Sequence, residues 1–317
     1  MRAAFLDWGS VTAGDLDDQC LRCLPVDWAF HENTGPSQLA ERTRQCEVVV
    51  TNKVSLNAND LQQADKLGLI CVAATGTNNI DLDAAARQDI AVCNVTGYAT
   101  DSVVQHVFML MLQLARQQPA YQAALQRGRW QQSEHFCFLD YRIESLANKT
   151  LGIVGYGELG QAVANMASQF GMDVLVAQRL HGTPLPNRVA FDELLSRVDV
   201  LSLHCPLTEQ TRHLIAAPQL ALMKPTAFVI NTARGGIIHE PDLLHALQNG
   251  QIGGAALDVL EQEPPPEDSL LLKETLPNLI ITPHIAWASR QARQKLIGGV
   301  AANITGWLQG KIINRVN

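Results

Sequence analysis

Long apolar runs are missing from this sequence of 317 residues. The most apolar stretch, residues 103–115, is interrupted by Gln105, His106 and Gln113, whereas a helix that spans a bilayer needs about 20 mostly apolar residues. The N-terminal residues also lack the charged start, apolar stretch and cleavage site of a secretion signal. We therefore expect a cytoplasmic protein with no membrane partner.

Clusters of lysine and arginine are missing as well, and the net charge is −7. A nucleic-acid-binding protein carries a basic patch, so we expect no nucleic-acid partner. The 47% hydrophobic and 17% charged residues are typical of a globular protein. The length exceeds what one hydrophobic core usually organises, which favours two domains.

Cysteines are sparse, and their pattern is not that of a disulfide framework. Their number, seven, is odd, and they are spread over the whole chain, which favours reduced thiols. Cys20 and Cys23 form a C-x-x-C pair, but a structural zinc site needs a second Cys/His pair. We interpret the pair as two small residues on an amphipathic helix and expect no metal site.

Short apolar β-rich segments alternate with helical patterns, which indicates parallel sheets covered on both faces. The first series of strands is predicted at residues 3–6, 26–30, 48–51, 69–73 and 91–94, and the second at residues 151–154, 174–177, 200–203, 227–230, 255–257 and 279–281. The sequence thus predicts an α/β fold with two doubly wound parallel-sheet domains, a Rossmann domain and a flavodoxin-like substrate domain, with a cleft between them.

Two long helices suggest where the chain passes from one domain to the other. The first opens with capping residues at 100–102 and runs past Ala115. It is apolar almost all round, so we expect it between the domains or in a subunit interface. The second, at residues 289–308, carries the chain back to the first domain. We predict a discontinuous substrate-binding domain, 1–98 with 285–317, and a Rossmann domain at 99–284.

Residues 151–170 read as a strand, a G-x-G-x-x-G turn and a helix. In this pattern Gly155 permits a tight turn, Gly157 lets the backbone approach a pyrophosphate, and Gly160 lets helix pack on strand. The N-terminus of the helix offers N–H donors to the phosphates. The alternative, a purely structural glycine turn, explains the strand–turn–helix context less well, so the segment predicts dinucleotide binding.

The end of the next predicted strand is irregular. An acidic residue that would bind the adenosine ribose is replaced by Gln178, and Arg179 follows it. Glutamine can bond a ribose hydroxyl without repelling a 2′-phosphate, and an arginine attracts one. Both NAD and NADP stay open, and we favour NAD because an arginine just beyond the strand often only covers the adenine.

Three further segments, residues 229–236, 257–264 and 280–287, place polar side chains after successive predicted strands, where open α/β sheets bind their ligands. Together with the glycine loop upstream they resemble the D-isomer-specific 2-hydroxyacid dehydrogenases over essentially the whole chain. Within that family, residues 51–53, 74–82, 101–108 and 136–138 most resemble the glycerate dehydrogenase (hydroxypyruvate reductase) branch.

The resemblance implies that Arg234, Glu263 and His284 are catalytic. A guanidinium can pair with the carboxylate of a 2-keto acid and polarise its carbonyl. An imidazole can give a proton to the oxygen that hydride arrival leaves charged, and take it back in the reverse direction. A carboxylate on the other ring nitrogen fixes the tautomer and favours the charged ring.

Each of these three residues has a simpler reading when taken alone. Arg234 could form a surface ion pair, Glu263 could be an exposed acid in a proline-rich loop, and His284 could cap a helix. Their order after three strands and a dinucleotide loop favours the joint catalytic reading. The best rival for the acid is His204, which also follows a strand, and we interpret it as structural.

The resemblance also implies contacts with the cofactor and the substrate. Tyr156, Glu158 and Leu159 would line the phosphates, Cys205, Pro206 and Thr211 the adenosine side, and Thr232, Ala233 and Asp258 the nicotinamide. The backbone of Thr75 and Gly76 would hold the substrate carboxylate, with Asn52 and Lys53 near its far end. Lys53 as a solvated surface charge is nearly as well supported. Residues 130–141 could roof the pocket or pack between subunits.

The function expected on these grounds is hydride transfer between NAD(P)H and a small 2-keto acid, from hydroxypyruvate or glyoxylate to D-glycerate or glycolate. Two alternatives stay open: a nicotinamide-sensing regulator of the corepressor type, and a phosphite dehydrogenase. No docking segment favours the regulator, and an acid-paired histidine argues against a formate dehydrogenase. A homodimer is expected from the resemblance and the apolar helix at residues 103–115.

Overall fold

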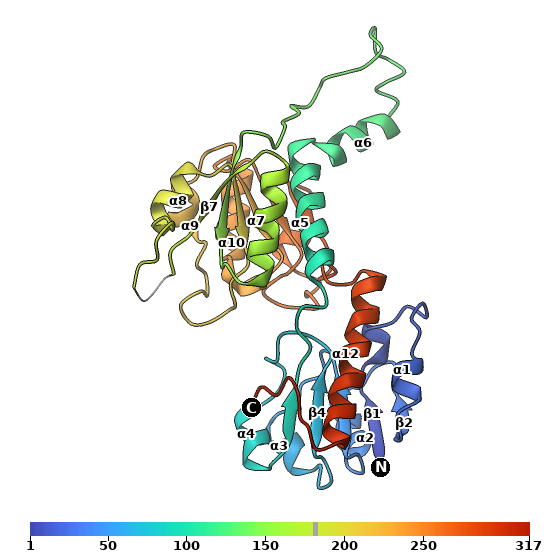
Figure 1. Ribbon diagram of the computed structural model, residues 1–317. Helices are drawn as coiled ribbons and strands as arrows, with labels where there is room; N and C mark the ends of the chain where they lie inside the picture. The colour runs from blue at the N-terminus through green and yellow to red at the C-terminus, as the bar shows by residue number, and fades with distance from the viewer. Residues whose placement is uncertain (180–182) are drawn as a thin grey trace. The chain divides into compact units, whose positions relative to one another are not determined.

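The computed structural model describes residues 1–179 and 183–317 (Figure 1). The chain divides into two compact units. The first comprises Met1–Ala99 and Trp287–Asn317, and the second comprises Thr100–Ala286. None of the helices among the described residues is both long enough and apolar enough to cross a bilayer.

The first unit contains a five-stranded parallel sheet with the order β2-β1-β3-β4-β5. Its strands are β1 (Arg2–Phe5), β2 (Asp27–Phe30), β3 (Val48–Thr51), β4 (Leu69–Val72) and β5 (Ala91–Cys93). Its helices are η1 (Trp8–Ser10), α1 (Gln19–Arg22), α2 (Pro36–Thr43), α3 (Ala58–Gln62), α4 (Leu82–Arg87) and α12 (Arg290–Leu308). The order reverses at β1, as in flavodoxin-like sheets.

Two cores lie on opposite faces of this sheet because successive side chains of a strand point to opposite sides. Val48 and Val50 of β3 belong to the core that includes apolar residues of α12. Val49 belongs to the other core, which includes Leu39 of α2 and Leu61 of α3. A strand buried on both faces must be apolar at every position, which explains why β3 reads as an unbroken run of valines before Thr51.

The second unit contains a six-stranded parallel sheet with the order β11-β10-β9-β8-β6-β7. Its strands are β6 (Thr150–Val154), β7 (Asp173–Val176), β8 (Val200–Leu203), β9 (Phe228–Asn231), β10 (Gly254–Leu257) and β11 (Leu279–Ile281). Its helices are α5 (Thr100–Ala115), α6 (Gln118–Gln126), α7 (Glu158–Gln169), α8 (Phe191–Arg197), α9 (Ala217–Leu222), η2 (Gly235–Ile237), α10 (Glu240–Gln248) and α11 (Leu270–Lys273). The prediction of two doubly wound parallel sheets is confirmed.

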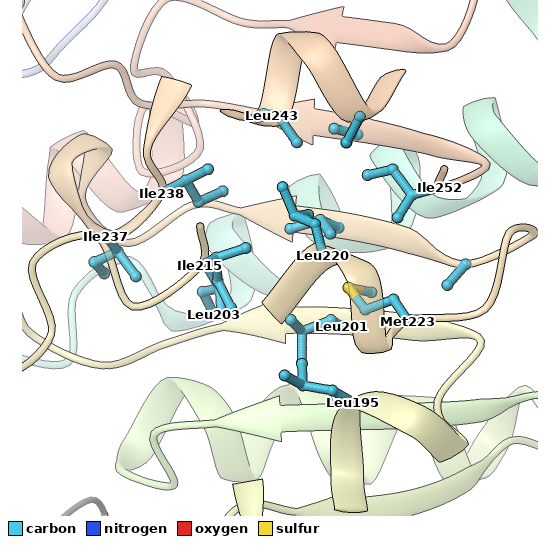
Figure 2. Close-up of a cluster of buried hydrophobic side chains, with 14 of the residues drawn as sticks. Leu195, Leu201, Leu203, Ile215, Leu220, Met223, Ile237, Ile238, Leu243 and Ile252 are labelled. Carbon is cyan, nitrogen blue, oxygen red and sulfur yellow. The ribbon is translucent and has the colours of Figure 1, made fainter. Parts of the chain in front are cut away.

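Helices cover both faces of the six-stranded sheet. Figure 2 shows the core on one face, where Leu201 and Leu203 of β8 lie among side chains that include Leu220 of α9 and Leu243 of α10. α5 and α7 run side by side (Figure 1), and α5 packs on β9 and β10. These contacts explain the burial of α5 within the second unit. Its apolar pattern alone is therefore no evidence for a domain or subunit interface.

Candidate active site

Arg234, Glu263 and His284 follow three neighbouring strands of the second unit. Arg234 lies just beyond β9, Glu263 lies in the loop after β10, and His284 lies just beyond β11. Because all strands are parallel, the loops that follow them meet at one edge of the sheet. The three side chains line one cavity of about 180 Å³, together with neighbours in the same loops and with Leu207 from the loop after β8.

His284 and Glu263 form a close pair. Nδ1 of His284 lies 2.6 Å from Oε2 of Glu263, and the two side chains are 25% and 35% exposed. The other carboxylate oxygen, Oε1, accepts from the backbone N–H of Leu260 at 3.0 Å. An ionised carboxylate can only accept, so this pairing places a proton on Nδ1 and makes Nε2 the nitrogen available for chemistry.

The turn that carries His284 is built around the buried side chain of Asp258. Its Oδ1 accepts from the N–H of Ile285 at 2.9 Å, and Oδ2 accepts from the N–H of Ala286 at 2.8 Å. The hydroxyl of Thr282 donates to Oδ1 as well. Asp258 is only 1% exposed, so these partners organise the turn. Its expected contact with the nicotinamide stays a prediction.

Arg234 is held by the loop between β9 and η2. The buried side chain of Asn231 donates to the carbonyl oxygen of Arg234 at 2.8 Å and accepts from the N–H of Ala233 at 3.0 Å. A Cβ atom on Gly235 would lie 1.9 Å from the carbonyl oxygen of Leu260. The glycine after Arg234 is therefore required where the loop passes against the loop that carries Glu263.

The glycine loop follows β6 and lies against the segment after β8, at the place where the strand order reverses. Gly155 has a φ of +91°, and a Cβ there would lie 2.5 Å from the backbone N of Cys205. Gly157 is the N-cap of α7 and has no side chain to cap the helix, and a Cβ on Gly157 would meet no described atom within 4 Å. Among the described residues, the loop thus leaves open space beside helix N–H donors that have no partner within the helix.

A second cavity, of about 410 Å³, opens beside this loop. Eight of the predicted cofactor contacts line it: Gly155, Tyr156, Gly157, Gln178, Arg179, Cys205, Pro206 and Thr211. Glu158, Leu159 and Gly160 belong to the first turn of α7 next to it, and Gly160 packs on the carbonyl of Gly155. Thr232 and Ala233 lie instead after β9, where the Thr232 hydroxyl is buried with no partner among the described residues.

Gln178 has partners that the sequence does not reveal. Its side-chain amide donates to the carbonyl oxygen of Leu185 and accepts from the N–H of Leu185, both at 2.9 Å. The side chain therefore holds the backbone at Leu185. Three residues further on, the Arg188 guanidinium lies 4.3 Å from the centre of the Tyr156 ring. Arg188 is a cavity residue that sequence reasoning missed, because nothing in the pattern tells which loop side chain returns to the site.

His204, the rival histidine, has a different environment from that of His284. Its Nε2 lies 2.9 Å from the hydroxyl of Ser202 on its own strand. Burial lowers the pKa of His204 to about 4, so its ring is neutral near neutral pH. A ring that is already deprotonated is a poor general acid, which supports the structural reading.

In the first unit the predicted substrate residues lie in loops after β3 and β4. Asp7, which follows β1 and is buried, accepts from the backbone N–H of Asn52 at 2.9 Å and of Lys53 at 2.6 Å. The side chain of Asn94 donates to the carbonyl oxygen of Thr75 at 2.7 Å, next to Gly76. Sequence reasoning missed Asp7. The only sign of its role in the sequence is that an acidic residue directly follows an apolar strand segment.

Comparisons with known proteins agree with this arrangement. A family profile described as D-isomer specific 2-hydroxyacid dehydrogenase, NAD binding domain, matches residues 108–286. The chain is 43% identical to a glycerate dehydrogenase of Methylorubrum extorquens over 92% of its length and 93% of the relative. It is 34% identical to a hydroxypyruvate reductase of Blautia hydrogenotrophica over the full length of both.

Among solved structures, a glyoxylate reductase from Paecilomyes thermophila superposes with a TM-score of 0.84 at 26% identity, and the match covers 99% of this chain and 98% of that one. Two relatives above 30% identity over nearly the whole chain, together with a profile that covers more than half of it, identify the family. The chain therefore belongs to the D-isomer specific 2-hydroxyacid dehydrogenases, a family of NAD-dependent oxidoreductases.

Proposed function

We propose that the protein reduces a small 2-keto acid, with hydroxypyruvate and glyoxylate as the first candidates, to the corresponding 2-hydroxy acid, D-glycerate or glycolate. The observation that carries this proposal is the 2.6 Å pair of His284 and Glu263 in one cavity with Arg234. A cation for the carboxylate and an acid for the carbonyl oxygen are the two groups that such a reduction needs.

In this mechanism Arg234 binds the substrate carboxylate and polarises the adjacent carbonyl. A nicotinamide held by the glycine loop would supply the hydride. His284, protonated on both nitrogens, gives the Nε2 proton to the developing alkoxide, and Glu263 keeps the Nδ1 proton in place throughout. In the oxidative direction Nε2 of the neutral ring takes the proton of the hydroxyl. Thr75, Gly76, Asn52 and Lys53 of the first unit remain proposed substrate contacts.

The cofactor is proposed to lie along the glycine loop. The open space at Gly157 and the uncapped N-terminus of α7 would take the pyrophosphate. Tyr156, Gln178, Arg179, Cys205, Pro206 and Thr211 would line the adenosine half. The buried Thr232 hydroxyl, which lacks a partner among the described residues, supports a ligand near the end of β9.

A homodimer is proposed as the working form. The segment after α6 is internally organised, since Arg129 pairs with Asp140 at 2.6 Å and the indole N–H of Trp130 donates to the carbonyl oxygen of Phe136 at 2.9 Å. Yet Phe136 is 90% and Leu139 is 77% exposed. An ordered segment that presents large apolar side chains is typical of an interaction surface, and we propose that a second copy of this chain covers it.

The oligomer proposal is tested by light scattering of the wild type and of the Phe136→Asp, Leu139→Asp double variant. We expect a dimer and a monomer, respectively. A monomeric wild type would contradict the dimer and favour the segment as part of the pocket.

The seven cysteines are free thiols, which supports a reducing compartment such as the cytoplasm.

The experiment that tests the activity is a substrate panel with both cofactors. The purified protein is given NADH or NADPH with hydroxypyruvate, glyoxylate and larger 2-keto acids, and NAD with phosphite. We expect cofactor oxidation with the small 2-keto acids. Turnover of phosphite alone would contradict the proposal, and no turnover of any substrate by protein that binds NADH would favour the regulator.

A further inference from the structure

Helix α5 is mostly apolar, yet two of its polar side chains lie against the turn that carries His284. His106 Nε2 lies 2.9 Å from Oγ1 of Thr282 and 3.4 Å from Oδ1 of Asp258. Ser102, four residues earlier, donates its hydroxyl to the carbonyl oxygen of Ala286 at 2.7 Å. Residues four apart lie on one face of a helix, so this face of α5 contacts both ends of the 282–286 turn.

The directions of the hydrogen bonds follow from a count of protons. The carboxylate of Asp258 can only accept, and it takes the one hydroxyl proton of Thr282 at 2.5 Å. The Thr282 oxygen must then accept from His106, which places a proton on Nε2 of that ring. Burial lowers the pKa of His106 although Asp258 opposes the effect, so the ring is neutral near neutral pH and can donate.

The turn needs such support because of its backbone. His284 has a φ of +54°, in the left-handed region that residues with a side chain rarely adopt. Its own N–H donates to the carbonyl oxygen of Asp258 at 2.8 Å, and the N–H groups of Ile285 and Ala286 bind the Asp258 carboxylate. A strained conformation persists only where its surroundings impose it, and Ser102 and His106 contact this turn from α5.

We infer that His106 and Ser102 are positioning residues that hold the 282–286 turn, and with it the imidazole of His284, in the geometry that proton transfer requires. This inference rests on the proposed function, since it assigns to α5 a role in the chemistry of His284. It also explains why the apolar stretch at residues 103–115 is interrupted by a histidine. A purely structural contact would lower stability without separating kcat from KM.

The first test uses three variants at neighbouring positions of α5. His106→Leu removes the donor, His106→Gln keeps an N–H near the place of Nε2, and Gln105→Ala is a control at an exposed position. We expect His106→Leu to lower kcat on the order of ten-fold with KM for the 2-keto acid unchanged, because a displaced catalytic group slows the chemical step. His106→Gln should restore most of kcat, and Gln105→Ala should match the wild type.

The second test needs no turnover. Hydrogen exchange of the amides of Ile285 and Ala286 is followed in the protein without substrate. We expect exchange about ten-fold faster in His106→Leu and Ser102→Ala, because loosening the turn exposes these two donors. Amides of β8 serve as an internal control and should keep their rates.

The outcomes separate this inference from the proposed function. A kcat of His106→Leu within about two-fold of wild type, or a His106→Gln variant as impaired as His106→Leu, would overturn the inference. Unchanged exchange at Ile285 and Ala286 would overturn it as well. If the wild type turns over no 2-keto acid, but Ile285 and Ala286 exchange faster in His106→Leu and Ser102→Ala than in the wild type, the proposed function is contradicted. The support of the turn by α5 is then still established.

Discussion

The two halves of the six-stranded sheet end in loops of opposite character. Loops after β6, β7 and β8 line the larger cavity with glycines, an amide and arginines, and His204, whose pKa is lowered to about 4 by burial, follows β8 directly before the cavity residue Cys205. Loops after β9, β10 and β11 enclose the smaller cavity, where a cation lies beside a histidine paired with a carboxylate. The first set fits a large phosphorylated ligand, and the second fits proton transfer to a small acid. A histidine after a strand is thus not catalytic by position alone, because its partner decides its role.

The largest effect is expected for His284, and it tests the proton-transfer role assigned to the loops after β9, β10 and β11. His284→Ala should lower kcat by a factor on the order of a hundred or more, because a general acid is lost. Steady-state kinetics with the best 2-keto acid measure it, and His245→Ala, an exposed histidine on α10, is the control. A nearly active His284→Ala variant would shift the chemical role to another group.

Arg234→Ala should act mainly on substrate capture. Loss of a charged hydrogen-bonding partner costs about 1.5–3 kcal/mol, so KM for the keto acid should rise by roughly ten- to a hundred-fold. Arg197→Ala, which removes an exposed arginine paired with Glu193 on α8, should leave KM unchanged. If kcat and KM of Arg234→Ala both equal those of the wild type, Arg234 does not belong to the site.

Glu263→Gln keeps the size of the side chain but replaces the carboxylate that faces Nδ1. We expect kcat to fall on the order of ten-fold with little change in KM, because the charged ring loses its stabilising partner. Glu267→Gln, in an exposed part of the same loop, is the matched control. Equal kcat values for the two variants would argue that the 2.6 Å pair is incidental.

His204 offers the opposite test, on stability and not on rate. Its pKa is lowered to about 4 in the folded protein, so between its ordinary value of about 6.5 and 4 the unfolded chain binds a proton that the folded chain does not. Stability is therefore lost as pH falls through this window. Urea unfolding at about pH 7 and about pH 5 should show a smaller loss for His204→Gln than for wild type, with kcat at neutral pH nearly equal. A large loss of kcat would make His204 part of the chemistry.

The smallest expected effect concerns the adenosine side. Arg188→Ala removes the guanidinium over the Tyr156 ring, a contact worth about 0.5–1 kcal/mol at an exposed site. The dissociation constants of NADH and NADPH should therefore rise together, by roughly two- to five-fold. Fluorescence titration of both cofactors measures this. A rise for NADPH alone would show that Arg188 binds a 2′-phosphate.

The sequence predicted the layers of the fold well because local pattern decides them. A strand that is buried on both faces is mostly apolar, as β3 and β8 are. These two strands and β11 begin and end where the pattern places them. Other strands differ by a residue or so at an end, where hydrogen bonding and not hydropathy ends a strand. The G-x-G-x-x-G turn was predictable because two of its requirements are local: the positive φ of Gly155 and the close approach of Gly160 to the carbonyl of Gly155. The approach of Gly155 to Cys205 is a contact that the pattern does not show.

The sequence pattern does not predict contacts between segments that lie far apart in the chain. Gln178 lines the cavity proposed for the cofactor, but nothing in the sequence indicated that its amide also binds the backbone of Leu185. Asp7, Arg188 and His106 were not assigned to any site. The side chain of each contacts its partner only in the folded structure, and the apolar periodicity of the sequence carries no information about such a contact.

The amino-acid sequence by itself determined two parallel sheets, the glycine loop and the order of Arg234, Glu263 and His284 after three strands, because propensity and apolar period act locally. Only the tertiary structure decided that β9, β10 and β11 are neighbours, that Glu263 reaches Nδ1 of His284, and that α5 supports the turn between Thr282 and Ala286. Those distances depend on how distant segments pack, and packing is a property of the whole chain.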